Sequence, residues 1–515
     1  MTTTPYRSDL RTGRGGFAQS LRAEWTKFRT VRGWVIGSIA AGLVTVLVGM
    51  LSIASDSRPD HVADPRVPIG PGGQAVNDSF YFVHQPLAGD GSITVPVTSL
   101  TGRTAMGPQH MRAETQPWAK AGIIVKQKLE QGSAYAALMV TGGHGVRWQY
   151  DYTHDTAGTP GAVSPASPRW LRLVRSGDTI TGYDSADGSR WNQVGTARLP
   201  GLPSTVEAGL FVTSPASIHV TSIDVGTYNP ASATAAFGHV ELRGQWPQGS
   251  WQGGQFGGVG TSGNYPPKTS GGHTRTGSGF TVTGAGDIAP VVGGGALGNG
   301  DTIEGFLVGT FAGLIVVIVM ATMFITAEYR RGLIRTTLAA SPRRGRVLVA
   351  KALVISAVTF AVGLVTAIVM IASGRPLAKA TGFYLFPVSS LTELRVVAGT
   401  AALLAVAAIL ALAIGAILRH GAGAVTAVIA AIVLPYMLAT VPGLPPGAAR
   451  WLLRVTPAAG FAIRQSIPFY PQVDSTYIPP AGYYPLSPWA GFAVLCGYAV
   501  VALGLAVVLL RRRDA

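Results

Sequence analysis

Six long apolar segments alternate with polar segments along the chain. Each has about 20 residues or more and no charge near its middle, which is the length of helix that crosses a hydrocarbon core of roughly 30 Å. Runs of this kind predict membrane-spanning helices. The predicted spans are residues 34–54, 305–327, 347–373, 396–418, 422–441 and 489–510.

A different pattern separates the first span from the second. Residues 55–302 lack a long apolar run and instead hold short apolar stretches that are divided by Gly, Asp and Pro. Residues 170–175, for example, alternate apolar and polar side chains as a half-buried strand does. Short strands at such spacing predict an antiparallel all-β sandwich, inserted between two spans. Strands are expected at 80–83, 92–97, 121–125, 135–140, 146–152, 170–175, 179–183, 206–212 and 217–225, before a Gly-rich tail at 244–300.

Residues 1–33 form a basic segment ahead of the first span. The helical period places four apolar residues of this segment on one face, so residues 17–32 predict an amphipathic helix at the membrane interface. An ordinary basic flank of a span is the alternative. The first apolar run is too long for a signal peptide. The four apolar residues are Phe17, Leu21, Trp25 and Phe28.

Basic residues gather in three places: before the first span, at 328–346 between the second and third spans, and after the sixth span. Short loops rich in Lys and Arg stay on the cytoplasmic side. We therefore expect a multi-pass protein of the cell membrane with both termini in the cytoplasm. Residues 55–302 would lie outside the cell, as would the segment 442–488, which has the pattern of a re-entrant or interfacial helix.

Composition agrees with this membrane topology. Apolar residues make up 47% of the chain and charged residues only 12%, against roughly 25% charged in soluble domains. The net charge of +16 lies beside the spans, so it is interpreted as orienting and lipid-contacting charge and not as a nucleic-acid site. The single cysteine, Cys496, excludes a disulfide within the chain.

Two features that the sequence lacks limit the classes of membrane protein to which the chain could belong. The spans carry no titratable residue at mid-depth, which disfavours an ion-coupled carrier. The pattern GxxxxGK[ST] occurs nowhere in the chain, so no P-loop nucleotide site is expected. Transport driven by ATP would then need a separate ATPase, with ATP and magnesium bound on that partner, and no cofactor is expected on this chain.

Two short segments resemble signature segments of bacterial type 2 ABC exporter permeases: LRAEWTKFR at 21–29, and EYRRGLIRTTL at 328–338 followed by SPRRGR and Lys351. The resemblance covers residues 17–54 and 303–513. It implies six spans, an N-terminal elbow helix, a cytosolic coupling helix within 328–346, and two permeases, identical or homologous, per transporter. The alternative is that these residues only orient helices against lipid headgroups. Residues that the resemblance places near the ATPase are Glu24, Trp25, Lys27, Glu328, Arg330, Arg331 and Arg335.

The insert departs from that family, in which the loop after the first span is short. Its residues 170–175, 184–188 and 191 resemble a concanavalin-like lectin or glucanase sandwich. Asp184 and Asp187 are expected in a turn, and Trp170 and Trp191 between the sheets. Candidate glycosidase carboxylates and metal ligands are too scattered to predict catalysis. The period of a strand puts three aromatic residues on one face, where they would stack on a cell-wall glycan or pack in the core: Trp148, Tyr150 and Tyr152.

The sequence therefore predicts an α-helical membrane protein with six transmembrane helices and an inserted extracytoplasmic β-sandwich. Its expected function is that of the permease subunit of an ABC exporter, without enzymatic activity of its own. The alternative function is a membrane-anchored carbohydrate sensor or adhesin, although one span would suffice as an anchor.

Overall fold

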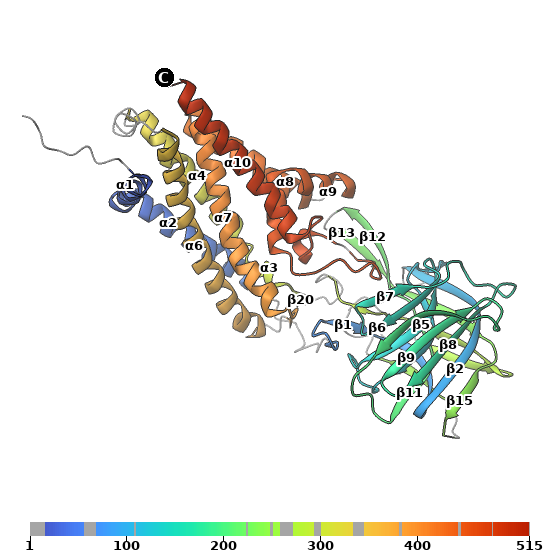
Figure 1. Ribbon diagram of the computed structural model, residues 1–515. Coiled ribbons are helices and arrows are strands. Elements are labelled where there is room, and N and C mark those ends of the chain that lie inside the picture. Colours follow the sequence, from blue (N-terminus) through green and yellow to red (C-terminus); the bar gives the residue numbers. More distant parts are fainter. Residues whose placement is uncertain are drawn as a thin grey trace, which may run out of the picture.

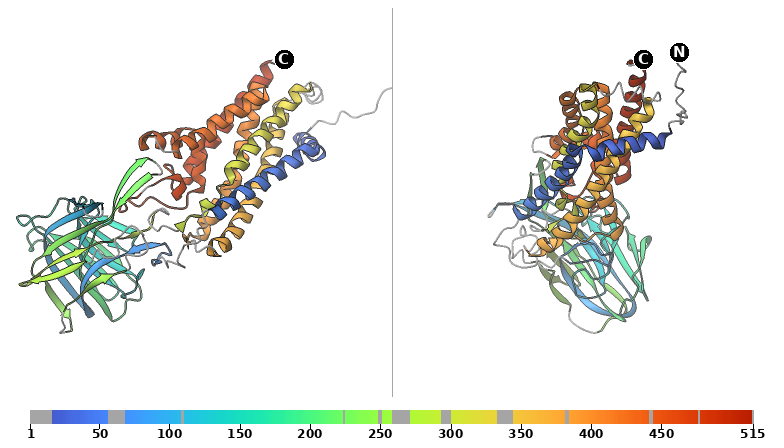
Figure 2. Two further views of the ribbon diagram at one scale, coloured as in Figure 1. Left: turned by 180° about the vertical axis from the view of Figure 1, so that it is seen from behind. Right: turned by 90° about the vertical axis from the view of Figure 1, so that its left-hand side faces the viewer.

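The computed structural model of the chain has a helical part and a β part (Figure 1). The β part lies beyond one end of the helices in every view (Figures 1 and 2). The helix α1 (Phe17–Thr30) and the C-terminal end of α10 (Pro488–Arg513) lie at the opposite end of the helical part. The described residues are 16–55, 68–107, 110–222, 225–247, 251–257, 271–292, 300–332, 344–380, 384–440, 444–475 and 477–513.

Six helices of the described residues are long and apolar enough to cross a membrane, as the hydrophobic pattern predicts. Some boundaries differ from the predicted spans. The third helix runs from Arg344 to Ala380 and not only over 347–373, and the fourth begins at Ser390 and not at 396. A short helix, α3 (Ile303–Phe306), ends before the second long helix begins, so the second starts at Thr310 and not at residue 305. The six are α2 (Arg32–Ser55), α4 (Thr310–Arg330), α6 (Arg344–Ala380), α7 (Ser390–Leu418), α8 (Gly421–Thr440) and α10.

Helix α7 is the centre of the helical part. Within the apolar stretch of each helix, 67% of α7 is buried, against 22% of α2 and of α10. Small residues allow the close approach of its neighbours, since a Cβ on Gly399 would lie 2.5 Å from Ile463 and one on Gly415 would lie 2.8 Å from Ile325. Such small residues are typical of packed helices in membranes, where no water drives association. The outer faces of α2 and α10 are left for lipid or for another chain.

The outer segment between α8 and α10 folds into short helices, as its pattern predicts. Helix α9 (Pro446–Val455) is amphipathic, with Leu453 buried and Trp451 65% exposed. The following helix, η2 (Pro457–Arg464), is buried along its whole length against α7 and α10. A last short turn, η3 (Pro479–Ala481), precedes α10. The segment therefore re-enters the bundle at its outer end and does not lie over it as a loop.

The β part is organised around one strand, β2 (Phe80–Gly107). Two strands that the sequence predicted separately are both parts of it. Its first half pairs with β11 (Thr205–Thr213), and beyond Gly89, whose φ of 66° permits a change of direction, it pairs with β8 (Arg169–Ser176). Because β2 takes part along both halves, the strands form one curled, barrel-like sheet, which agrees with the predicted all-β antiparallel domain.

The strand order around β2 is β10-β9-β8-β2-β11-β4-β5-β6-β7, and all pairs in this sheet are antiparallel, as predicted. The bounds of the strands not yet given are β1 (Val76–Asp78), β3 (His110–Ala113), β4 (Lys120–Lys126), β5 (Tyr135–Thr141), β6 (Val146–Tyr150), β7 (His154–Ala157), β9 (Thr179–Ser185), β10 (Asn192–Arg198), β12 (Ser217–Ser222), β13 (Val225–Asn229), β14 (Ala231–Phe237), β15 (Glu241–Gln245), β16 (Gln252–Phe256), β17 (Gly272–Thr276), β18 (Gly279–Gly284), β19 (Ile288–Pro290), β20 (Gly300–Asp301) and β21 (Tyr384–Leu385). Strands β3, β14, β15 and β16 also pair with β2, and β18 pairs with β14 and β17. The pairs β1–β19, β12–β13 and β20–β21 form separate two-stranded sheets.

Buried ion pairs, and not disulfides, fasten strands over the second face of the sheet. The ammonium of Lys126 lies 2.7 Å from Asp78 in β1, and both side chains are fully buried. The ammonium of Lys120, also fully buried, lies 2.7 Å from Asp287. Burial of Lys126 lowers its pKa, although the charge and hydrogen bond of Asp78 act in the opposite direction. These pairs fix β1 and β19 over a small aromatic core of the sheet.

Two predictions within the insert need correction. Trp170 and Trp191 are half-buried and do not pack in the core of the sheet. Trp170 lies under the turn at Gly188, and the Trp191 ring lies 3.8 Å from the guanidinium carbon of Arg172. Asp187 does form the turn, because it accepts hydrogen bonds from the backbone of residues 189 and 190. Asp184, by contrast, is 1% exposed within β9 and belongs to the sheet.

The β part is docked on the outer loops of the helical part. Ser475 donates a hydrogen bond of 2.9 Å to the carbonyl of Val292, and Gln472 donates one of 3.2 Å to the carbonyl of Tyr152. A small apolar cluster that includes Ile467 lies beside them. The insert and the two termini thus lie at opposite ends of the helices, as the topology requires. Which end faces the cytoplasm stays a prediction.

Candidate functional site

The buried face of α1 differs from the predicted one. Phe17 and Trp25 are 37% and 47% exposed, whereas Phe28 and the acidic Glu24 are buried. Leu21 is half-buried against the bundle. The spacing of Leu21, Glu24 and Phe28 is that of one helical face, so the chain turns a carboxylate, and not Trp25, toward the bundle. The predicted contact of Phe17 and Trp25 with the membrane interface stays a prediction.

Glu24 belongs to a compact cluster of two acidic and two basic side chains. The ammonium of Lys351, in α6, lies 2.6 Å from Glu24 and 2.6 Å from Glu328 at the end of α4. The ammonium of Lys27 lies 2.9 Å from Glu24 and 3.4 Å from Glu328. We call these four residues the charge cluster. It joins three helices that are far apart in sequence, and its formal charge is zero.

Burial makes the charge cluster sensitive to the loss of any one member. The side chains of Lys351 and Glu24 are 1% and 3% exposed, and that of Glu328 is 13% exposed. Removing two charges from water costs several kcal/mol per ion, roughly, and the cost is repaid only by close pairing. The Phe324 ring, 4.8 Å from the Lys351 ammonium, adds a cation–π contact.

Lys27 is the exposed member of the charge cluster, with 40% of its side chain accessible. Partial burial alone would lower the pKa of Lys27, but the hydrogen bonds and charges of Glu24 and Glu328 outweigh it, so the pKa is raised above its ordinary value. Lys27 therefore stays protonated at physiological pH.

Aromatic contacts hold α1 in place beside the charge cluster. The Phe324 ring of α4 receives the edges of two other rings, Phe28 at 6.1 Å and Trp34 at 5.3 Å. Trp25 stacks on the outer side of Phe28 at 6.2 Å. Edge-to-face and stacked pairs at these distances add to the burial of apolar area. The turn between α1 and α2 is thereby fixed to the end of α4.

A hollow of about 620 Å³ opens next to the charge cluster, between the α1–α2 turn and α4. Its walls are mostly apolar and its rim is charged. The residues that line it are Lys27, Val31, Gly33, Trp34, Gly37, Val316, Val319, Met320, Met323, Phe324, Ala327, Glu328, Arg330 and Arg331.

The predicted ATPase-contact residues lie in different environments. Glu24, Lys27 and Glu328 come together in the charge cluster. Arg330 and Arg331 are exposed where α4 ends. Trp25 is half exposed on α1, and Arg335 lies outside the described residues, as does the predicted coupling helix from 333 onward. Glu24 is thus turned into the protein, so a direct contact with a partner is not its role in this structure.

The sequence reasoning missed Lys351 as a site residue. The available signal was its position: a lysine eight residues into α6, within an otherwise apolar run, needs a buried counter-ion. The candidates were the two acidic residues that flank the predicted cytosolic elements, Glu24 and Glu328. That Glu24 and Glu328 both contact Lys351 follows only from the packing of α1 against α6.

The three predicted glycan-contact residues do not form one exposed face. Trp148 and Tyr152 are each 1% exposed, so neither ring is open to a sugar. The strand ends at Tyr150, which is half-buried and stacks on His154 at 4.0 Å. Tyr152 follows with a φ of 66° and donates a hydrogen bond of 2.7 Å to Asp78, in a different core from Trp148. The prediction of a shared face is therefore wrong, because the backbone reverses after Tyr150.

A second buried carboxylate lies at the outer end of the bundle. Glu304, in α3, is 5% exposed and accepts a hydrogen bond of 2.6 Å from Ser466. Arg464, 2% exposed, donates a hydrogen bond of 3.0 Å to the backbone carbonyl of Glu304. Burial raises the pKa of Glu304 from 4.5 to about 7, although these neighbours favour the charged form. The residue joins the start of the second span to the re-entrant segment.

Stability of the chain is expected to depend on pH through Glu304. Its pKa is higher in the folded chain than in the unfolded chain, so the folded state holds the proton more tightly. The stabilisation is complete below pH 4.5, and roughly 3 kcal/mol is lost as pH rises to about 7. Glu304→Gln should flatten this part of the pH profile of Tm, measured on the purified chain, whereas Glu393→Gln at a partly exposed site should not. A profile of Glu304→Gln that parallels the wild type would contradict this.

Comparison with known proteins adds no assignment. No protein-family model and no curated protein matches the sequence. Among solved structures, a functionally unknown protein from Saccharomyces cerevisiae is 15% identical, with a TM-score of 0.22, over 38% of this chain and 95% of its own. Scytalido-glutamic peptidase with a transition-state analogue inhibitor is 10% identical, with a TM-score of 0.25, over 42% of this chain and all of its own. At such scores neither likeness bears on function.

Proposed function

We propose that this chain is the membrane-spanning subunit of an ATP-driven exporter of the type 2 ABC class, and that a separate ATPase subunit energises it. Two such chains, identical or homologous, would enclose the transport pathway, and two ATPase subunits would bind below them with ATP and magnesium. The β insert would lie outside the cell, where the substrate leaves.

The charge cluster is the observation that carries this proposal. Glu328 lies four residues before the end of the described part of α4 and its turn, and Lys351 lies eight residues into α6. The intervening segment holds the predicted coupling helix. Because Lys351 binds Glu328 and also Glu24, both ends of that segment are tied to each other and to α1. A force on the loop would then move α1, α4 and α6 together.

A role in coupling also explains why charges are buried here at all. A buried ion pair is seldom more stable than apolar packing of the same volume, but it fixes one arrangement of its helices. In an exporter, the arrangement of α4 relative to α6 is what an ATPase must change. The exposed Arg330 and Arg331 next to the hollow provide guanidinium groups for carboxylates of the partner.

Charge reversal tests the proposed dock. The variant Arg330→Glu/Arg331→Glu/Arg335→Glu is expected to abolish co-purification of the cognate ATPase, a loss of about 100-fold or more, because like charges would face the partner's carboxylates. A P-loop protein from a neighbouring reading frame would be the first ATPase to test.

The matched control is Arg450→Glu/Arg454→Glu, which reverses exposed arginines of α9 at the other end of the bundle. It should leave co-purification unchanged. Equal recovery of the ATPase with the cytosolic triple variant and with the wild type would count against the dock.

A further inference from the structure

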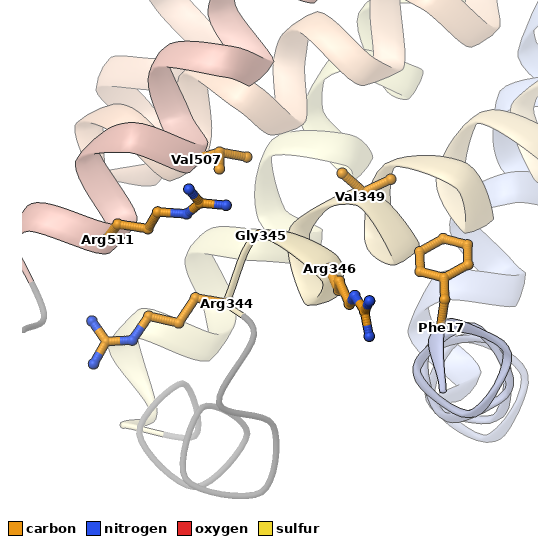
Figure 3. Close-up of a pocket in the computed structure, with 7 residues that line it drawn as sticks. All are labelled: Phe17, Arg344, Gly345, Arg346, Val349, Val507 and Arg511. Carbon is orange, nitrogen blue, oxygen red and sulfur yellow. The ribbon is translucent and has the colours of Figure 1, made fainter. Parts of the chain in front are cut away.

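A basic pocket lies at the end of the bundle that carries the termini, apart from the charge cluster. Its volume is about 690 Å³, and α1, the start of α6 and the end of α10 form its walls (Figure 3). Three of its residues are arginines, and the described lining includes no acidic residue. The lining residues are Phe17, Arg344, Gly345, Arg346, Val349, Val507 and Arg511.

The arginines of this pocket are largely unpaired. Arg344 donates a hydrogen bond of 3.3 Å to the carbonyl of Leu510, at the end of α10. Within the described part of the chain, Arg346 and Arg511 have no hydrogen bond or ion pair to another residue. Three guanidinium groups around one hollow repel each other and are most stable when an anion lies between them.

Gly345 opens the floor of the pocket. A Cβ at this position would lie 3.1 Å from Val507 and 3.5 Å from the guanidinium of Arg511, so the glycine lets the first turn of α6 approach α10 closely. The first backbone N–H groups of a helix are free to bind an anion, and the positive end of the helix dipole lies there. The floor thus adds to the positive field of the arginines.

The remaining walls are apolar. Val349 and Val507 lie toward the body of the bundle, and the exposed Phe17 ring stands at the side (Figure 3). A ligand that fits therefore has an anionic head and an apolar tail. The ends of membrane-spanning helices are at the depth where phospholipids combine these two chemistries, and basic pockets between helices on the cytoplasmic side bind acidic headgroups.

We infer that this pocket binds an anionic phospholipid of the inner leaflet. Its phosphodiester lies between Arg346 and Arg511, and an acyl chain runs along Val349 and Val507. The lipid joins α1 to the start of α6 and the end of α10, the three elements that line the pocket. This inference depends on insertion of the helices in a membrane with this end of the bundle in the cytoplasm, but not on the proposed ATPase.

Lipid titration of the purified full-length chain tests the inference. Phosphatidylglycerol is expected to raise the Tm and to remain bound in native mass spectrometry, whereas phosphatidylcholine with the same acyl chains should do neither. Equal effects of the two lipids would overturn the inference, since they would indicate ordinary boundary lipid. An equal rise in Tm with inorganic phosphate or glycerol phosphate would also overturn it, because the site would then be one for a free anion.

Variants of the pocket residues test whether phosphatidylglycerol acts through this pocket. Arg346→Gln/Arg511→Gln should weaken phosphatidylglycerol binding about tenfold or more, as expected when charged hydrogen bonds are lost. Arg512→Gln, which removes one positive charge outside the pocket, should change little. Val507→Trp fills the apolar wall without a change of charge and should also abolish the lipid-dependent rise in Tm.

Two outcomes of the variant series would overturn the inference. One is a rise in Tm with phosphatidylglycerol that persists in both pocket variants. The other is unchanged lipid binding together with loss of ATPase co-purification in Arg346→Gln/Arg511→Gln, which would assign these arginines to a protein partner.

Discussion

Lys351→Met is expected to lower the free energy of unfolding by about 3–5 kcal/mol, because it removes the buried counter-ion of Glu24 and Glu328 and leaves them facing only the partly exposed Lys27 of the charge cluster. Lys351 contacts Glu24 and Glu328 at 2.6 Å each, and its side chain is 1% exposed. Methionine preserves the length and the apolar part of the side chain, so the loss measures the charge and not the volume. Thermal or denaturant unfolding of the purified chain gives this quantity. Under the proposed function, the variant should also uncouple ATP hydrolysis from transport.

A double variant separates pairing from general damage. Glu24→Gln/Lys351→Met removes one charge of each sign, and Lys27 still faces Glu328 at 3.4 Å. It should be more stable than Lys351→Met alone, with a favourable interaction energy in the double-mutant cycle. If the two substitutions were simply additive, the charge cluster would not act as one unit, and its proposed role in coupling would lose its basis.

Trp148→Ala is expected to destabilise the insert by about 3–5 kcal/mol, the usual effect of deleting a buried aromatic side chain. The Trp148 ring fits against two glycines, since a Cβ on Gly195 would lie 2.3 Å from it and one on Gly182 would lie 2.6 Å from it. The two glycines have no side chains that could move into the space that the ring leaves. Loss of the insert's unfolding transition, followed by tryptophan fluorescence of the whole chain, measures the effect.

Trp191→Ala is the matched control for that experiment. Trp191 is half-buried over Arg172, so its removal should cost about 1 kcal/mol or less. The alternative function of carbohydrate sensing makes the opposite prediction for Trp148: a stable fold that has lost binding on a glycan array. A stable Trp148→Ala protein would contradict the burial of this ring in the core.

The sequence was sufficient for the six long apolar helices, because each is long enough to cross a bilayer and its apolar character does not depend on its neighbours. It was also sufficient for the antiparallel strands of the insert. It was not sufficient for their arrangement: the continuity of β2 through Gly89 depends on pairing with β11 and β8, which come more than 60 residues later. The prediction that Tyr152 shares a strand face with Trp148 was wrong for a local reason. Tyr152 has a positive φ, which interrupts the alternation of side chains along the strand.

The charge cluster, too, could be predicted only in part from the sequence. Glu24 and Glu328 were recognised from their segments, but the segments alone suggested that both face a partner. In the folded chain, a residue of the apolar α6 turns Glu24 inward. Period and composition report the average character of a face, and they do not report one ion pair between positions 327 residues apart. Such contacts follow from helix packing, which the sequence pattern leaves open.

The side of the membrane on which the loop at 328–346 lies is the most direct test of the proposed ATPase dock. A single cysteine at Thr336, introduced with Cys496→Ala, can be labelled with a membrane-impermeant maleimide in intact cells and in cells opened by detergent. The account predicts labelling only after opening, whereas a cysteine at the exposed Ala186 of the insert should be labelled in intact cells. Labelling of the Thr336→Cys variant in intact cells would place the loop outside, where no ATPase can reach it, and would contradict the account.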